Sequence, residues 1–327
     1  MTFRLFLLKI IRKISALTSL PESAMLFLVK NDKWRSWVNH FFDNLNYEEK
    51  RVFHSIFSEI FRGKKIEFKP DIWKLTFGRS YVQIPLTKEQ LWLDWDTALS
   101  VIGHDHEIKQ TYESLILSKF APTCFLDIGA NYGTHSLLFL MHGIHAISIE
   151  PNPNCKEYFD QLTRANNVEG RWIQVALGAK EGMAHLRYPT SDTWFGSISQ
   201  KERPELAAYT NWKGTDVKVT TLDSLVFAQG IEHIDLIKID TEGYETQVIQ
   251  GAGETIKRQR PLIIFECNNR KSRQEIQEEL SLYGYQFHAL PFLPGQLSTP
   301  MTKEMFISDP ASNFMAIQSE HPVLQTV

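Results

Sequence analysis

Four acidic residues, each at the end of a short apolar run, are the first sign of chemistry in this chain. The runs are CFLD, AISIE, LIKID and LIIFE, and the acids that end them are Asp127, Glu150, Asp240 and Glu266. Short runs that are apolar throughout are typical of strands buried in a parallel sheet. Ligands bind such sheets beyond the carboxyl ends of the strands. We therefore expect these acids to border a binding site.

Two of these acids suit the two ends of an adenosyl amino acid. Asp127 could accept a hydrogen bond from a ligand amine, and it would repel a pyrophosphate. Glu150 stands 23 residues later, where an acid can accept both ribose hydroxyls of an adenosine, as in dinucleotide sites. The pair indicates a nucleoside joined to a zwitterionic group.

The segment after Asp127 predicts a tight turn that leads into a helix. It reads G-A-N-Y-G, with Gly129, Asn131 and Gly133, and the helix is expected to begin near Thr134. Gly129 has no side chain and lets the backbone approach a ligand closely. The dinucleotide fingerprint G-x-G-x-x-G lacks its middle glycine here, which argues against a nicotinamide cofactor.

The elements that must position these residues form a regular series from about residue 107. Apolar runs alternate with helix-like stretches, which predicts βαβ units. The runs are CFLDIG, AISIEP, WIQVALG, LIKID and LIIFEC, and GYQFHAL with FMAIQ are expected to form a closing antiparallel pair. The fold class is α/β: a Rossmann-like, mostly parallel seven-stranded sheet with helices on both faces, over residues 101–327.

Residues 1–100 are predicted to be a mainly helical region with a short β segment, and their role is unknown. Apolar residues recur at helical spacing near residues 52–61, and KLTFGRSYVQIPL alternates like a hairpin. The first segment, MTFRLFLLKIIRKISAL, is too short and too charged to cross a bilayer. It is either an amphipathic helix packed on protein or a basic helix on a membrane surface.

Composition excludes few functions. The chain has 327 residues and a net charge of −3, which gives no reason to expect a nucleic-acid partner. Its three cysteines lack metal-ligand spacing and favour a reducing, cytoplasmic compartment. The sequence leaves open whether the chain forms homo-oligomers.

The motifs DIGANYG, IEPNP, KIDTEGYE and PLIIFE, in this order, resemble those of the FkbM-like methyltransferases. The resemblance covers about residues 103–320. It implies an S-adenosylmethionine-dependent enzyme that methylates a hydroxyl on a sugar or natural product. It also implies that Asp127, Gly129, Asn131 and Glu150 bind the cofactor. We add Gly133 of the same turn and, beside the adenine, Val175 and Ala176.

Other candidates follow from the resemblance. An acid-bearing helix in relatives suggests Glu107 as a cofactor contact, and Tyr112 is a weaker candidate from the same helix. A loop of the family that reaches the active site suggests Trp194, Phe195 and Ser197 as contacts of the acceptor.

A hydroxyl acceptor needs a base or a metal to lower its pKa. Asp240, which ends its strand, is the first candidate for the base. Glu242 and His135 are further candidates. Glu242 could instead be a turn or cap acid, and His135 could instead cap or pack its helix. Asp240, Glu266 and Asn268 form an oxygen set that could hold Mg²⁺, although we do not favour a metal because acids at sheet edges are common without one.

A lysine inside an apolar strand needs a charged partner, and for Lys238 we expect Glu266 on the neighbouring strand. Two other functions stay open. One is a nicotinamide-dependent oxidoreductase, and the other is a non-catalytic module that keeps the methyltransferase fold.

Overall fold

The chain folds into two compact units, each with its own sheet. The computed structural model describes residues 3–15, 20–61, 71–86, 101, 103–189, 196–198 and 210–325. One unit comprises Met1–Lys109 and Gln161–Asn167, and the other comprises Gln110–Asp160 and Val168–Val327. No helix among the described residues is long and apolar enough to cross a membrane.

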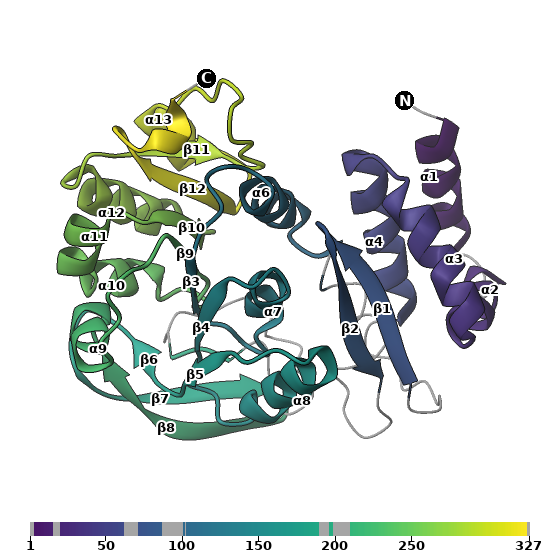
Figure 1. Ribbon diagram of the computed structural model, residues 1–327, viewed down its shortest axis with the longest axis horizontal. Helices are drawn as coiled ribbons and strands as arrows, with labels where there is room; N and C mark the ends of the chain where they lie inside the picture. Colours follow the sequence, from purple (N-terminus) through teal and green to yellow (C-terminus); the bar gives the residue numbers. More distant parts are fainter. Residues whose placement is uncertain are drawn as a thin grey trace. The chain divides into compact units, whose positions relative to one another are not determined.

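The first unit combines helices with one antiparallel hairpin, as the sequence predicted. Its elements are α1 (Phe3–Ser15), α2 (Leu20–Val29), α3 (Asp32–Asp43), α4 (Tyr47–Phe61), β1 (Asp71–Phe77) and β2 (Ser80–Leu86) (Figure 1). Trp73 on β1 is fully buried, and its ring packs edge-on against Phe57 of α4. Its indole N–H donates to Asn39 of α3 at 2.7 Å. Trp73 thus buries its ring, keeps its N–H hydrogen-bonded and packs the hairpin against the helices.

The second unit is built on a seven-stranded sheet in the order β11-β12-β10-β9-β3-β4-β5. The strands are β3 (Cys124–Ile128), β4 (His145–Ile149), β5 (Arg171–Ile173), β9 (Leu236–Ile239), β10 (Leu262–Glu266), β11 (Tyr285–Ala289) and β12 (Asn313–Gln318). Strand β12 runs antiparallel to both of its neighbours, and the other pairings are parallel. The predicted mostly parallel sheet with an antiparallel closing pair is confirmed.

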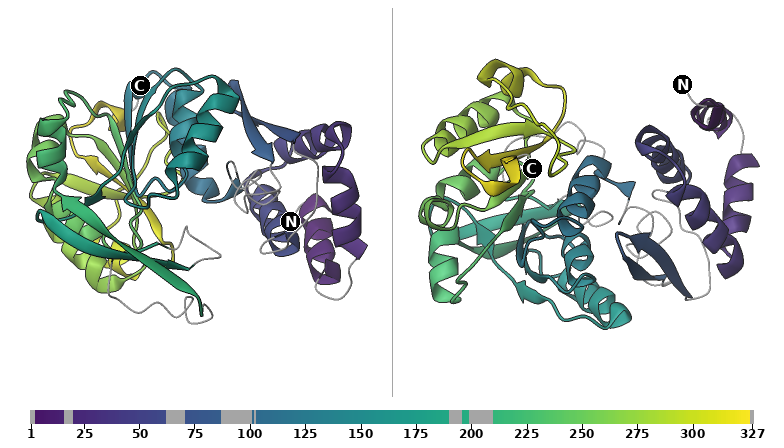
Figure 2. Two further views of the ribbon diagram at one scale, coloured as in Figure 1. Left: turned by 90° about the horizontal axis from the view of Figure 1, so that it is seen from below. Right: turned by 45° about the horizontal axis from the view of Figure 1, so that its top comes forward.

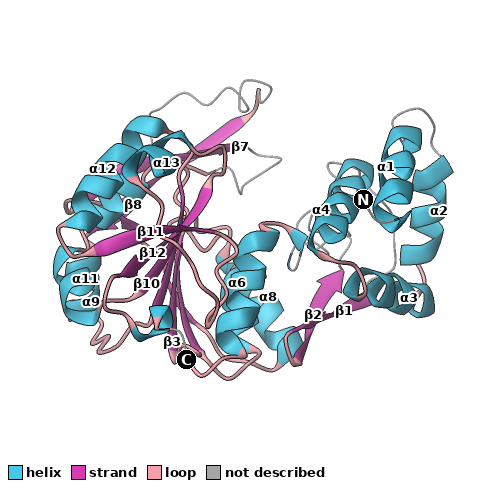
Figure 3. Cartoon of the chain, turned by 90° about the horizontal axis from the view of Figure 1, so that it is seen from above, coloured by secondary structure: helices cyan, strands magenta, loops and turns pink. Residues whose placement is uncertain are grey.

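Helices cover both faces of this sheet, which explains why its strands are apolar throughout. Figure 1 shows α9–α12 on one face, and α7 with the adjoining parts of α6 and α8 on the other. Figure 3 shows α9, α11 and α12 along one side of the same sheet. The helices are α6 (His106–Ile116), α7 (Thr134–Leu140), α8 (Lys156–Asn166), α9 (Leu222–Ala228), α10 (Glu245–Gln250), α11 (Gly253–Gln259), α12 (Arg270–Ser281) and α13 (Lys303–Ser308), followed by the 3₁₀ turn Pro322–Leu324.

The run WIQVALG, expected to be one strand, divides between two sheets. Its first part is β5 at the edge of the large sheet, and its second part is β6 (Ala176–Leu177). Strand β6 joins a small sheet of order β6-β8-β7 with β7 (Gly182–Pro189) and β8 (Trp212–Thr220). Figure 2 shows the long β7–β8 hairpin of this small sheet in teal and green. The prediction of a single strand was wrong, because apolar character does not reveal a change of sheet within a run.

Candidate functional site

The turn between β3 and α7 is pressed against the ends of two neighbouring strands. The N–H groups of Gly129 and Ala130 donate to the carbonyl oxygen of Ile149, which ends β4, at 2.9 and 3.1 Å. Gly129 has φ +76°, and a Cβ there would lie 1.7 Å from the backbone oxygen of Asp240, just after β9. Only glycine fits this position. The turn therefore brings the ends of β3, β4 and β9 together.

The other two turn residues differ in what they do. Asn131 adopts φ +51°, a left-handed conformation that asparagine tolerates better than most residues. Gly133 has φ +71° and precedes α7, and a Cβ there would lie 2.3 Å from the ring of Phe159 on α8. The structure thus gives Gly133 a packing role, and its contact with a cofactor stays a prediction.

Glu150, directly after β4, is held by two backbone donors. Its Oε2 accepts from the N–H of Asn131 at 3.0 Å, and its Oε1 accepts from the N–H of Asn152 at 2.8 Å. The residue is only 9% exposed, and burial raises its pKa from 4.5 to about 7. Each carboxylate oxygen keeps capacity for a further donor. The carboxylate can therefore accept from two further donors, and its contact with a cofactor stays a prediction.

Asp127 is fully buried and supports the start of α7. Its Oδ2 accepts from the backbone N–H and the hydroxyl of Ser136 at 3.2 and 2.9 Å. Burial raises the pKa of Asp127, and the nearby charge of Lys238 lowers it. Its Oδ1 has no hydrogen-bond partner in the described part of the chain. A buried acceptor without a donor is costly, so this oxygen is suited to receive one from a ligand or a water.

The acids after β9 and β10 form one linked group. Lys238, almost fully buried, donates to Asp240 at 2.9 Å, and the charge of Asp240 acts on the neighbouring Glu266. Asn268 donates to Glu266 at 3.0 Å. The lysine thus pairs with the acid of its own strand, whereas the sequence suggested Glu266. Asp240 follows Lys238 by two residues, and side chains two apart in an extended segment lie on the same side.

Glu266 holds a proton in this group at neutral pH. The negative charge of Asp240, followed by burial, raises the pKa of Glu266 to about 9. In the described ranges, no cluster of three or more His, Cys, Asp or Glu residues is arranged to hold a metal ion. In this group Lys238 donates to Asp240, and Asn268 donates to Glu266.

The loop from β9 to α10 is organised by an acid that the sequence analysis passed over. Glu245 is buried, and its Oε1 accepts from the N–H groups of Thr241 and Gly243 at 3.0 and 2.9 Å. These bonds hold Glu242 at φ +56°. The hydroxyl of Ser197 donates to the backbone oxygen of Glu242 at 3.0 Å. The signal for Glu245 was its place in the first turn of a helix, where an acid can satisfy free N–H groups.

The remaining candidates lie in different surroundings. His135 is buried in α7, where its Nδ1 lies 3.1 Å from the hydroxyl of Tyr112. Ala176 is 3% exposed within the small sheet's own core. Glu107 lies in the first turn of α6 and belongs to the first unit. Trp194 and Phe195 lie outside the described residues.

Comparison with known proteins finds a family model and several relatives that match this region. The model described as the methyltransferase FkbM domain matches residues 127–287, which contain the β3 turn, Glu150, Asp240 and Glu266. The 2-O-methyltransferase NoeI of Sinorhizobium fredii is 32% identical over 151 residues, which cover 41% of this chain and 59% of NoeI. The hexuronic acid methyltransferase AglP of Haloferax volcanii is 29% identical over 130 residues, which cover 38% of this chain and 48% of AglP.

Among solved structures, the methyltransferase FkbM of Methylobacillus flagellatus aligns with 14% identity and a TM-score of 0.38. The alignment covers 68% of this chain and 54% of that one. The chain therefore spans about half the length of the relatives it matches. The family match is to methyltransferases, so it favours that interpretation over the nicotinamide alternative.

Proposed function

Because residues 127–287 of this chain belong to the methyltransferase FkbM domain family, we propose that the protein is an S-adenosylmethionine-dependent O-methyltransferase. The proposed acceptor is a hydroxyl on a sugar or a similar small molecule. The relatives support this choice, since one is named a 2-O-methyltransferase and the other a hexuronic acid methyltransferase.

One observation carries the proposal: Glu150 stands at the end of β4 with each carboxylate oxygen fixed by a backbone N–H. An acid so held is oriented before a ligand arrives and loses little freedom when ribose hydroxyls bind to it. On the next strand, the Oδ1 of Asp127 lacks a donor. Together the two carboxylates suit the ribose and the amino group of S-adenosylmethionine, so the residues present fit that cofactor.

When bound, S-adenosylmethionine supplies a methyl group on a sulfonium, which the acceptor oxygen takes by in-line displacement. The residues of this chain must then position the acceptor and take its proton. Asp240 is the proposed base: its side chain is 26% exposed, while Lys238 beside it is 4% exposed. The lysine orients the carboxylate and compensates its charge. Glu242 and His135 remain further candidates for proton transfer.

The cofactor half of the proposal is tested by calorimetry with S-adenosylhomocysteine. We expect binding to the wild-type chain that is lost or greatly weakened in Glu150→Ala. The exposed acid Glu157 lies on α8, and Glu157→Ala is the matched control. No heat with the folded wild-type protein would overturn the proposal.

The acceptor half is tested by incubation with a labelled methyl donor and a set of hexuronic acids, neutral glycosides and amino sugars. We expect the label on a hydroxyl oxygen, mapped by mass spectrometry. We also expect Asp240→Asn to bind S-adenosylhomocysteine normally and to transfer methyl groups at least about a hundredfold more slowly. Label on nitrogen, or full activity of Asp240→Asn, would refute the respective assignment.

A further inference from the structure

Helix α1 turns its apolar side outward. A surface helix of a globular protein normally does the opposite, with its apolar residues toward the core. Its large apolar side chains recur at spacings of three and four and are exposed: Phe3 75%, Phe6 46%, Leu7 41%, Ile11 40% and Ile14 41%. Leu8, by contrast, is only 4% exposed. The amphipathic pattern of α1 is thus only partly explained by packing within the chain.

The orientation of α1 is set by specific contacts with its own unit. Arg12 pairs with Glu59 of α4 at 2.6 Å, and Arg4 donates to the backbone oxygen of Asn44 at 2.9 Å. With Leu8, these contacts occupy the inner side of the helix. The outward position of the phenylalanines therefore follows from how the helix is attached.

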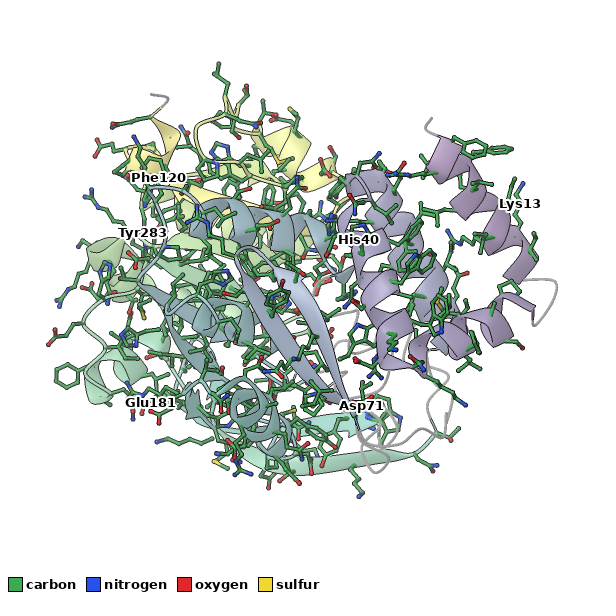
Figure 4. All side chains as sticks on the ribbon, turned by 45° about the vertical axis from the view of Figure 1, so that its right-hand side comes forward. Lys13, His40, Asp71, Phe120, Glu181 and Tyr283 are labelled. Carbon is green, nitrogen blue, oxygen red and sulfur yellow. The ribbon has the colours of Figure 1, made fainter. Side chains whose placement is uncertain are left out.

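The charges of α1 are of one sign. Residues 1–20 contain four basic and no acidic residues, whereas the whole chain has a net charge of −3. Lys9 and Lys13 are exposed and have no acidic partner among the described residues. Lys13 projects from α1 away from the neighbouring helices (Figure 4). Cations flanking an exposed apolar face complement an anionic surface that has an apolar interior.

The neighbouring helices of the same unit add exposed aromatic side chains. Phe27 on α2 is 66% exposed, and Trp34 and Trp37 on α3 are 44% and 53% exposed. The rings of Phe27 and Trp34 lie 6.2 Å apart. Tryptophan is enriched where proteins meet the boundary of a membrane.

We propose that α1 docks this chain on the surface of an anionic lipid bilayer, lying parallel to it. At 13 residues the helix is about 20 Å long, too short to span the hydrocarbon core. A second copy of the chain fits this face less well, because symmetric pairing of two α1 faces would bring their lysines together. The inference does not depend on the proposed methyltransferase activity.

The test is co-sedimentation of the full chain with vesicles of phosphatidylcholine alone and of phosphatidylcholine with phosphatidylglycerol. We expect binding to the anionic vesicles only. Phe3→Ser/Phe6→Ser should weaken it at least about tenfold, and Lys9→Gln/Lys13→Gln by about fivefold for each lysine. Phe227→Ser, at a more exposed phenylalanine on α9, and Lys257→Gln on α11 are the matched controls and should bind as wild type.

Circular dichroism checks that each variant is folded. If Phe3→Ser/Phe6→Ser unfolds the protein, Leu7→Gln/Ile14→Gln is used in its place. Equal binding to both kinds of vesicle, no binding to either, or unchanged binding of the apolar variants would overturn the proposal. So would a dimer in sedimentation equilibrium that Phe3→Ser/Phe6→Ser converts to a monomer, because a second copy would then be the occupant of this face.

Discussion

Replacing Glu150 by glutamine should show how much of cofactor binding depends on its charge, because glutamine has nearly the same size and shape. Burial raises the pKa of this carboxyl from 4.5 to about 7, so its charge changes within the working range of most assays. The ionised form is the one that accepts two hydroxyl donors well. Glutamine keeps the size of the side chain and one acceptor oxygen, and its NH₂ group faces a backbone donor.

The expected effect on binding follows from that pKa. Between pH ~8 and ~6 the ionised fraction of a group with a pKa near 7 falls about tenfold. The dissociation constant of S-adenosylhomocysteine should therefore rise about tenfold over this range. Hydrogen bonds to a charged group contribute about 1.5–3 kcal/mol, so Glu150→Gln should bind about ten- to 150-fold more weakly at pH ~8. Its affinity should also depend little on pH.

The same substitution changes stability in a defined direction. The unfolded chain releases the Glu150 proton near pH ~4.5, whereas the folded chain keeps it until about pH 7. Unfolding therefore releases a proton in this window, and the free energy of unfolding falls as pH rises through it. The difference between these two pKa values corresponds to at most about 3.4 kcal/mol of the free energy of unfolding. Glu150→Gln should remove most of this slope.

Calorimetric titrations at several pH values, together with urea denaturation of the same proteins, measure both effects. Glu157→Gln, at an exposed acid on α8, is the control and should leave both curves unchanged. An affinity of the wild type that is flat in pH would contradict the assignment of Glu150 to the ribose. A Glu150→Gln variant that binds as tightly as wild type would contradict it equally.

Three further predictions concern other parts of the second unit. Gly129→Ala should lower the free energy of unfolding in urea by at least about 2 kcal/mol more than Gly143→Ala. Both glycines have positive φ, but only at Gly129 would an added Cβ meet the backbone, at the oxygen of Asp240. Glu266→Gln should flatten the pH dependence of the free energy of unfolding between pH ~5 and ~9. The folded chain keeps the Glu266 proton to about pH 9, whereas the unfolded chain releases it near pH ~4.5, so the wild type loses stability as pH rises. Denaturation at each pH would refute this if the free energy of unfolding changed with pH equally in both proteins. The thiol of the half-buried Cys124, whose pKa is raised to about 11 by burial, should react slowly with a thiol reagent at neutral pH, and labelling as fast as free cysteine would refute this.

The sequence predicted the large sheet well because burial on both faces leaves a direct signal. Strands β3, β4, β9 and β10 coincide with the apolar runs, and the four acids lie at or directly after the carboxyl ends of these strands, as expected. The turn was also predictable, since Gly129 occupies a position that no other residue fits. In each case one local constraint decides the structure.

Features that depend on neighbours distant in the sequence were not predictable. The division of WIQVALG depends on the pairing of β6 with β8, some forty residues later. The partner of Lys238 is an exception: Asp240 lies only two residues away on the same side of the chain, whereas we had expected an acid of the neighbouring strand. Asn166 exchanges two 2.7 Å hydrogen bonds with the backbone of Gln83 in the β2 strand, which accounts for the grouping of the end of α8 with the first unit.

We propose that the ends of β3, β4 and β9 together border one binding site for S-adenosylmethionine. A crystal structure of the chain with S-adenosylhomocysteine tests it most directly. We predict both ribose hydroxyls within hydrogen-bond distance of Glu150, with the sulfur directed toward Asp240. A nucleoside bound at another edge of the sheet, or one whose ribose leaves Glu150 without contact, would contradict the claim.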